Sequence, residues 1–238
     1  MLVEFLNYLN KQIGQPYVWG GQHTKLTPET YEAIIKAKDS QTVLRQRSIA
    51  FCKKAFKTAS VLYGYDCSGL GMYWLQNVKK LSKSDMSANM MLGKCEKISK
   101  TNLKKGCWVF RVNKSGNAYH IGYVIDSALN IIEAQGRAYG VVKRGLNAGG
   151  TGYWNAFGVP EYFKAEIEKQ ETFKVARLLK IGMNGKDVAA VKEALVNQGF
   201  LKKSTNDVFG NGTLRAVKKA QKAHGLKTDG IVGKDTVT

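Results

Sequence analysis

Cys67 and His120 are the residues of this chain whose types and settings could perform covalent chemistry. A cysteine nucleophile needs an imidazole to take its proton and a polar group to hold that imidazole in place. Cys67 follows a polar, glycine-rich stretch and precedes an apolar, helix-like one, so we expect it at a helix N-terminus. There the free N–H groups and the helix dipole would lower the pKa of the thiol and help to form an oxyanion hole.

His120 opens the apolar segment 120–125, which has the composition of a β-strand. A rigid strand could direct the imidazole towards the tip of the helix that carries Cys67. A single histidine at the start of a strand is more often structural than catalytic. The case for His120 as a base therefore depends on the setting of Cys67.

The cysteines form no C-x-x-C pair, and no histidine lies at the spacing of a zinc ligand. We therefore expect no metal site and no cofactor. The remaining thiols are interpreted as reduced core residues, namely Cys52, Cys95 and Cys107.

Hydrophobic periodicity predicts the elements that must position these side chains. Residues 2–13 read as an amphipathic helix, and the stretch 27–63 as a basic pair of helices. Four short strands follow from runs of apolar and aromatic residues, and their short connections favour an antiparallel sheet. These strands are expected at residues 107–112, 119–126, 129–135 and 139–144. Helices followed by such a meander indicate the α+β fold class.

Charge points to a polyanionic partner, because 37 Lys and Arg oppose 18 Asp and Glu for a net charge of +19. Nucleic acid, an anionic membrane and the anionic polymers of a bacterial wall would all be attracted. We expect no nucleic-acid partner, because the chain lacks the interleaved aromatic and basic motifs of a nucleic-acid module. No apolar run reaches the roughly 20 residues that span a bilayer, so no membrane insertion is expected.

Three sequence blocks together resemble the NlpC-type family of papain-like cell-wall cysteine peptidases, related to the CHAP group. The blocks are Tyr17-x-x-Gly-Gly, Asp66-Cys67-Ser68-Gly69-Leu70 and His120-Ile121-Gly122-Tyr123. The resemblance implies a papain-like helix-plus-antiparallel-sheet domain with Cys67 as nucleophile, His120 as base and Tyr17 near the oxyanion. Asp66 and Ser68, which flank the nucleophile, are assigned to the same substrate and oxyanion site. A helical insertion at about 22–63 stands where the family has a short loop.

The third catalytic residue departs from the family, which commonly has a second histidine on the strand after the base. Glu133 takes the matching place, and Gln135 lies on the same face of the strand because residues two apart share a face. The CHAP group has a similar acidic-x-amide pair. We therefore predict that Glu133 accepts the Nδ1–H of His120, with Gln135 as its partner or substitute.

Residues 175–238 resemble a small, all-α peptidoglycan-binding domain, with matches at Gly185-Lys186-Asp187-Val188 and Phe209-Gly210-x-x-Thr213. The segments 207–213 and 229–236 also resemble each other, which predicts duplicated loop-to-helix units. The predicted organisation is a peptidase domain at 1–165, a charged linker at 166–174 and a binding domain at 175–238.

The resemblance implies a peptidoglycan hydrolase that cleaves the stem peptide at the D-γ-glutamyl–diamino acid bond. The alternatives are an N-acetylmuramoyl-L-alanine amidase and a non-catalytic basic wall-binding protein. Because the N-terminus shows no secretory signal peptide, we expect a phage endolysin. It would stay in the host cytoplasm until a holin-type protein releases it, and would then act on peptidoglycan and anionic wall polymers.

Overall fold

The computed structural model describes residues 1–150, 152–170, 177–197, 199–202, 206–223, 225–233 and 236. Its contacts divide the chain into two units, Met1–Gln170 and Glu171–Thr238. Residues 166–170, expected in the linker, belong to the first unit. There the helix α6 (Lys164–Glu168) buries Ile167, and Glu166 accepts hydrogen bonds from the backbone N–H of Leu2.

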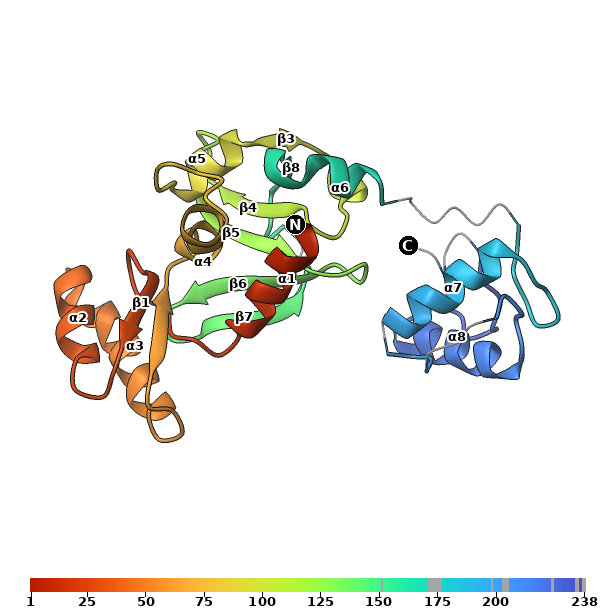
Figure 1. The fold of residues 1–238 in the computed structure, drawn as a ribbon, viewed down its shortest axis with the longest axis horizontal. Coiled ribbons are helices and arrows are strands. Elements are labelled where there is room, and N and C mark those ends of the chain that lie inside the picture. The colour runs from red at the N-terminus through yellow and green to blue at the C-terminus, as the bar shows by residue number, and fades with distance from the viewer. Residues whose placement is uncertain are drawn as a thin grey trace. The chain divides into compact units, whose positions relative to one another are not determined.

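A six-stranded antiparallel sheet forms the centre of the first unit, in the order β3-β8-β4-β5-β6-β7 (Figure 1). The four predicted strands are β4 (Trp108–Val112), β5 (Ala118–Val124), β6 (Asn130–Gly136) and β7 (Gly140–Gly145). Sequence reasoning missed β3 (Cys95–Lys97) and β8 (Ala156–Pro160), which are short and lack a clear alternation of apolar residues. The fold class is therefore α+β, as predicted.

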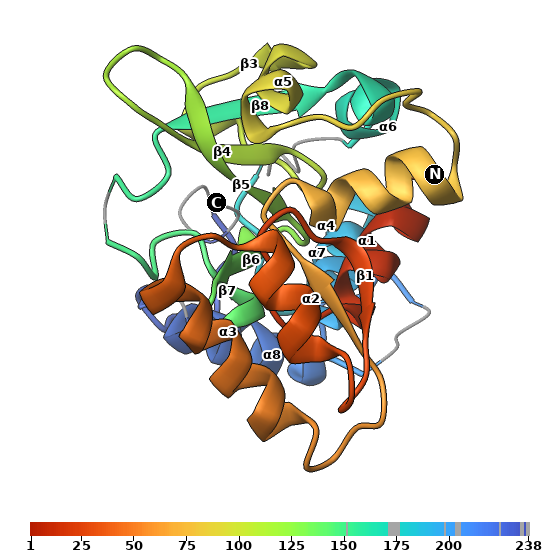
Figure 2. The same cartoon turned by 90° about the vertical axis from the view of Figure 1, so that its left-hand side faces the viewer.

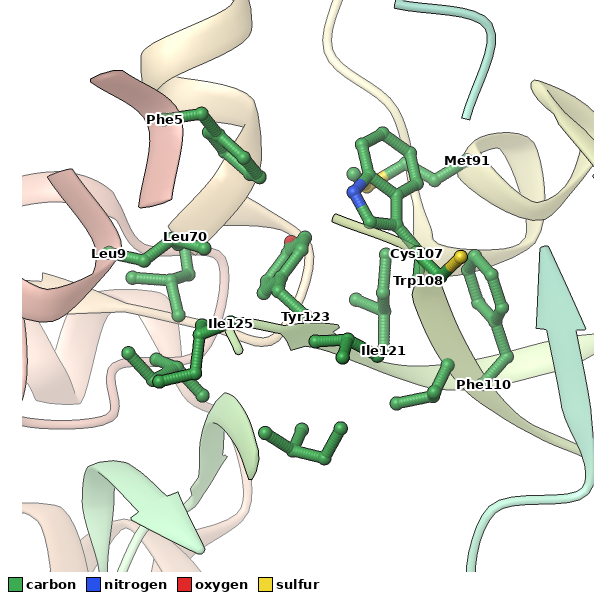
Figure 3. Close-up of a cluster of buried hydrophobic side chains, with 14 of the residues drawn as sticks. Phe5, Leu9, Leu70, Met91, Cys107, Trp108, Phe110, Ile121, Tyr123 and Ile125 are labelled. Carbon is green, nitrogen blue, oxygen red and sulfur yellow. The ribbon is translucent and has the colours of Figure 1, made fainter. Parts of the chain in front are cut away.

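Two helical segments cover one face of this sheet. They are α1 (Leu2–Lys11) and α4 (Gly69–Met72), which continues as a π-helix (Tyr73–Val78). The Phe5 ring meets the Tyr123 ring edge-on at 5.5 Å, and both lie in the apolar cluster of Figure 3. Burying side chains of this size contributes about 1.5–3 kcal/mol each. Ile13, expected on the same helix face, is 41% exposed because α1 ends at Lys11.

The insertion is a small subdomain with a core of its own. It contains β1 (Gln22–Leu26), α2 (Tyr31–Lys38), α3 (Thr42–Ala55) and β2 (Leu62–Tyr65). The expectation of helices alone was incomplete, because β1 and β2 form an antiparallel pair with Gln22 opposite Tyr65. This pairing returns the chain to the point where it left, so the chain enters and leaves the insertion at one place (Figure 2).

Three short helices complete the first unit: α5 (Ala88–Gly93), η2 (Lys100–Asn102) and η3 (Glu161–Phe163). Throughout the described part of the chain, no helix combines the length and apolar character needed to cross a bilayer.

The second unit contains α7 (Lys186–Asn197) and α8 (Asn211–Ala223) around a separate apolar core. Each helix holds one of the two similar segments, 207–213 and 229–236, through hydrogen bonds from a buried polar side chain. Lys192 of α7 donates to the carbonyls of Asn206 (2.8 Å) and Val208 (3.1 Å). Gln221 of α8 donates to the Ile231 carbonyl (2.9 Å) and accepts from the Gly230 N–H (2.8 Å). Part of the second repeat, residues 234 and 235, lies outside the described residues.

Candidate active site

Cys67 lies in the tight turn between β2 and α4, and the Tyr17 block lies alongside this turn. The Val18 N–H donates to the Tyr65 carbonyl (2.9 Å), and the Asp66 N–H donates to the Gly21 carbonyl (2.8 Å). The backbones approach so closely that a Cβ at Gly69 would lie 2.1 Å from the Gly21 oxygen. Only glycine fits at such a position, which explains why two of the sequence blocks carry glycines there.

Two neighbours hold the turn. The Asp66 carboxylate accepts hydrogen bonds from the Gly69 N–H (2.6 Å) and the Ser68 hydroxyl (3.3 Å). From the sheet, the Tyr123 hydroxyl donates to the Cys67 carbonyl (3.3 Å) and accepts from the Gly71 N–H (3.1 Å). Asp66 and Ser68 therefore support the backbone of the nucleophile, and their contact with substrate stays a prediction.

The environment of Cys67 raises the pKa of its thiol to about 12, mainly through burial and further through the nearby Asp66 charge. Hydrogen bonds from the backbone N–H groups of Ile121 and Ser68 oppose this shift without overcoming it. The expected lowering by the helix N-terminus was wrong, because burial of the thiol outweighs the backbone N–H groups that face it. Cys67 is therefore a neutral thiol that needs a base.

His120 lies on β5 beside the Ile121 N–H that reaches the thiol, and its Nε2 is 2.5 Å from the Glu133 carboxylate. Tyr123 of β5 pairs with Ile132 of β6, so Glu133 falls opposite Gly122 and shares a sheet face with His120. Glu133 was expected at Nδ1, but it engages Nε2, so Nδ1 is the ring nitrogen left for the thiol proton.

Gln135 is half-buried on the same strand, and its side chain makes no hydrogen bond within the described part of the chain. The structure thus gives only one of the two residues predicted to orient the imidazole, Glu133, a hydrogen bond to His120. The assignment of Glu133 as the catalytic partner stays a prediction about chemistry.

Sequence reasoning missed Trp154, Arg144 and Tyr153. The Trp154 ring stacks on His120 with centroids 5.5 Å apart and planes 9° apart. Arg144 of β7 donates through Nε to the Glu133 carboxylate, and its guanidinium lies 4.3 Å from the centre of the Tyr153 ring. One signal was available, since a glycine inside a strand marks a close approach. A Cβ at Gly122 would come within 2.8 Å of the Trp154 ring.

Tyr17 is 7% exposed, and its backbone pairs with Tyr65, two residues before Cys67, which places Tyr17 near the nucleophile. Burial raises the pKa of Tyr17, and the charges of Cys67 and Asp66 add to this effect. Its hydroxyl therefore stays protonated and can donate. Arg137 lies over the Tyr17 ring at 5.9 Å and pairs with Asp39 of the insertion at 2.5 Å.

His23 is a structural residue of β1. Its ring stacks between those of Tyr63 (3.9 Å) and Tyr73 (4.0 Å), and it forms a hydrogen bond with Tyr65. Within the ranges described above, no three His, Cys, Asp or Glu side chains gather as metal ligands do.

Comparison with known families decides the assignment. The profile of the NlpC/P60 family matches residues 14–157, which is more than half of the chain. The chain belongs to the NlpC/P60 family. Members of this family are cysteine peptidases that cleave peptidoglycan, so the predicted enzyme class is confirmed. A second profile, for a peptidoglycan binding domain, matches residues 184–238 and confirms the predicted two-part character of this NlpC/P60 protein.

Solved structures with a similar chain trace include the NlpC/P60 domain of the peptidoglycan hydrolase SagA, with 19% identity and a TM-score of 0.41. That match covers 66% of this chain and 97% of the other. The peptidoglycan hydrolase RipB from Mycobacterium tuberculosis matches with 20% identity and a TM-score of 0.43, over 67% of this chain and 64% of the other. Among curated proteins, none matches this sequence.

Proposed function

We propose that this NlpC/P60 protein is an endopeptidase that cuts the peptidoglycan stem peptide at the D-γ-glutamyl–diamino acid bond. The observation that carries the proposal is the buried contact between His120 and Glu133, next to the Cys67 turn. A neutral thiol, an imidazole and a buried carboxylate are the three parts that cysteine acyl transfer requires.

In the proposed reaction, Nδ1 of His120 takes the thiol proton as the Cys67 sulfur attacks the γ-carbonyl carbon. Because burial raises the pKa of the thiol to about 12, sulfur attack and proton transfer to the base are expected to be coupled. Glu133 stabilises the imidazolium that forms, and the Tyr17 hydroxyl donates to the oxyanion.

Collapse of the tetrahedral intermediate releases the amine of the diamino acid, which takes the proton from His120. A thioester between Cys67 and the γ-glutamyl group remains. Water, deprotonated by His120, then hydrolyses this thioester and restores the thiol.

Mass spectrometry of digested walls tests the choice of bond. Endopeptidase action leaves fragments that end in D-glutamate and creates a free amine on the diamino acid. Release of intact stem peptides that begin with L-alanine would support the alternative amidase and contradict the proposal.

The second unit is proposed to hold the enzyme on peptidoglycan, aided by the attraction of a +19 chain to anionic wall polymers. Binding and lysis should both weaken between low salt and several hundred millimolar salt, because screening shortens the reach of the charge. The non-catalytic binding protein would be favoured by two results together. The chain would bind walls without lysing them, and Cys67→Ala would leave this binding unchanged.

We also propose that the protein works as a phage endolysin, made in the host cytoplasm and released to the wall by a holin-type protein. Support comes from the pairing of a wall-cutting unit with a wall-binding unit. Co-expression in a susceptible host tests this. Lysis should require a pore-forming partner, and lysis without any such partner would contradict it.

A further inference from the structure

The Glu133 carboxylate is fully buried and uses both of its oxygens. One oxygen contacts His120, and the other accepts the Nε–H of Arg144. Two cationic or potentially cationic groups thus share one carboxylate that solvent does not reach. A buried charge is strongly unfavourable unless it is paired. Both neighbours therefore stabilise the buried Glu133 carboxylate.

Arg144 is itself held by aromatic rings. Its position on β7, opposite Ile131 of β6, puts its side chain on the sheet face that carries Glu133. The Tyr153 ring lies 4.3 Å from the Arg144 guanidinium and 4.4 Å from that of Arg111. Stacking of this kind restricts where a guanidinium can go.

Trp154 directly follows Tyr153 in the sequence, and its ring stacks on His120. Two consecutive residues therefore fix both partners of Glu133: Tyr153 fixes Arg144, and Trp154 fixes the imidazole. Stability alone does not explain this arrangement. Within the described part of the chain, the buried Nη2 of Arg144 has no hydrogen-bond partner, which is unfavourable.

We propose that Arg144 is a positioning residue, which orients the Glu133 carboxylate against His120 and supplies a countercharge to this buried group. The inference rests on the proposed function, because it assigns a role in that reaction. It concerns a residue that acts through Glu133 and does not touch the substrate.

Among the described residues, three titratable groups face Glu133. These are His120 from β5, Arg144 from β7 and the Tyr153 hydroxyl, while Arg111 of β4 contacts the Tyr153 ring. Without Arg144, the negative charge of Glu133 would act on His120 alone. The carboxylate would also lose the contact that fixes its second oxygen, so it would hold the imidazole less firmly in place.

NMR of the histidine rings tests this directly, because the chain has only 3 histidines. The full chain is used as wild type, Arg144→Met and Arg144→Lys. Lys143→Met is the matched control. It removes the same charge from the same strand, but Lys143 lies opposite Ile132 on the other face and pairs with Asp126 at 3.5 Å.

In Arg144→Met the ring resonances of His120 should differ from those of the wild type, because the Glu133 carboxylate that contacts the ring is no longer held, while those of the other two histidines stay in place. Arg144→Lys, which keeps the charge, should change them less. Unchanged His120 resonances in Arg144→Met, or an equal change in Lys143→Met, would overturn the proposal.

Kinetics on purified walls separate positioning from charge. Arg144→Lys and Tyr153→Ala should lower kcat by about 10- to 100-fold with little change in KM, as seen when residues that orient a catalytic group are lost. If Arg144→Met does not fold, the kinetics of Arg144→Lys and Tyr153→Ala test the positioning role. Wild-type kcat in both would refute positioning. A wild-type chain that leaves walls intact would refute the proposed function instead, because the NMR spectra of the histidine rings need no substrate.

Discussion

The two halves of the candidate site are held in different ways. On the Cys67 side, the backbone of the turn packs directly against the backbone of the Tyr17 block, and the glycines at positions 21 and 69 make this contact possible. On the His120 side, the imidazole is held by side chains, namely the Glu133 carboxylate, the Arg144 guanidinium and the Trp154 ring. The nucleophile is thus fixed by chain geometry, and the base is fixed by charge and stacking. The two sides should fail differently when they are altered.

The largest effect is expected when either chemical partner is removed. Cys67→Ala and His120→Ala should each abolish wall lysis, and the double variant should be no worse than either one, because the two residues act as a unit. Lysis assays with circular dichroism as a folding control check this. EDTA should leave the wild type active. Loss of activity with chelator but not with an alkylating reagent would contradict a cysteine mechanism.

Within the His120 side, the carboxylate should matter far more than the amide. Glu133→Gln is expected to lower kcat by roughly 10²–10⁴-fold, because the imidazolium loses its buried countercharge. Gln135→Ala, which removes no hydrogen bond seen among the described residues, should cost less than about 3-fold. Steady-state kinetics on walls measure both. The reverse order of effects would assign the orienting role to Gln135.

Adding one methyl group to each side should separate stability from activity. Gly69→Ala would drive a Cβ into the Gly21 backbone oxygen, so we expect a loss of about 3 kcal/mol or more in unfolding free energy. Gly122→Ala meets side chains of Ile131 and Trp154, which can yield, so its cost should be nearer 1–2 kcal/mol.

Gly122→Ala should nevertheless lower kcat, because the displaced Trp154 ring no longer holds His120. Urea unfolding and wall kinetics measure the two quantities. Gly93→Ala is the matched control, since a Cβ there meets nothing within 4 Å. Equal losses of stability in Gly69→Ala and Gly122→Ala would remove the distinction between the two sides.

The smallest effect concerns His23, which anchors the insertion near the Cys67 side. Burial lowers the pKa of His23 in the folded chain from its ordinary value of 6.5. The unfolded chain therefore binds a proton more readily, and the contribution of His23 is complete above about pH 6.5 and lost as pH falls.

His23→Phe should reduce the drop in Tm between pH 7.5 and pH 5 by about 1 °C, a small amount because the ring is partly solvated. Calorimetry at the two pH values, compared with the wild type, measures this. A larger drop in Tm on acidification in His23→Phe than in the wild type would contradict the predicted direction of this effect.

The difference between the two sides also explains what could be predicted from the sequence. The Cys67 turn was recognisable because glycines and polar residues lie within a few positions of the nucleophile, and the Tyr17 block that packs on it carries glycines of its own. The strands β4 to β7 were also predicted, because each contains a run of apolar or aromatic residues.

Arg144 and Trp154 were missed because their contacts depend on strand register and on the return of the chain through β8. The lowered pKa expected for Cys67 failed for a related reason. Local sequence suggested a helix N-terminus, whereas the actual pKa direction comes from burial by distant segments.

The most direct test of the central claim is mass spectrometry of purified peptidoglycan after digestion by the wild type and by Cys67→Ala. The wild type should yield fragments cut between D-γ-glutamate and the diamino acid, and Cys67→Ala should yield none while still binding the wall. Identical fragments from both proteins would contradict the assignment of Cys67 as the nucleophile.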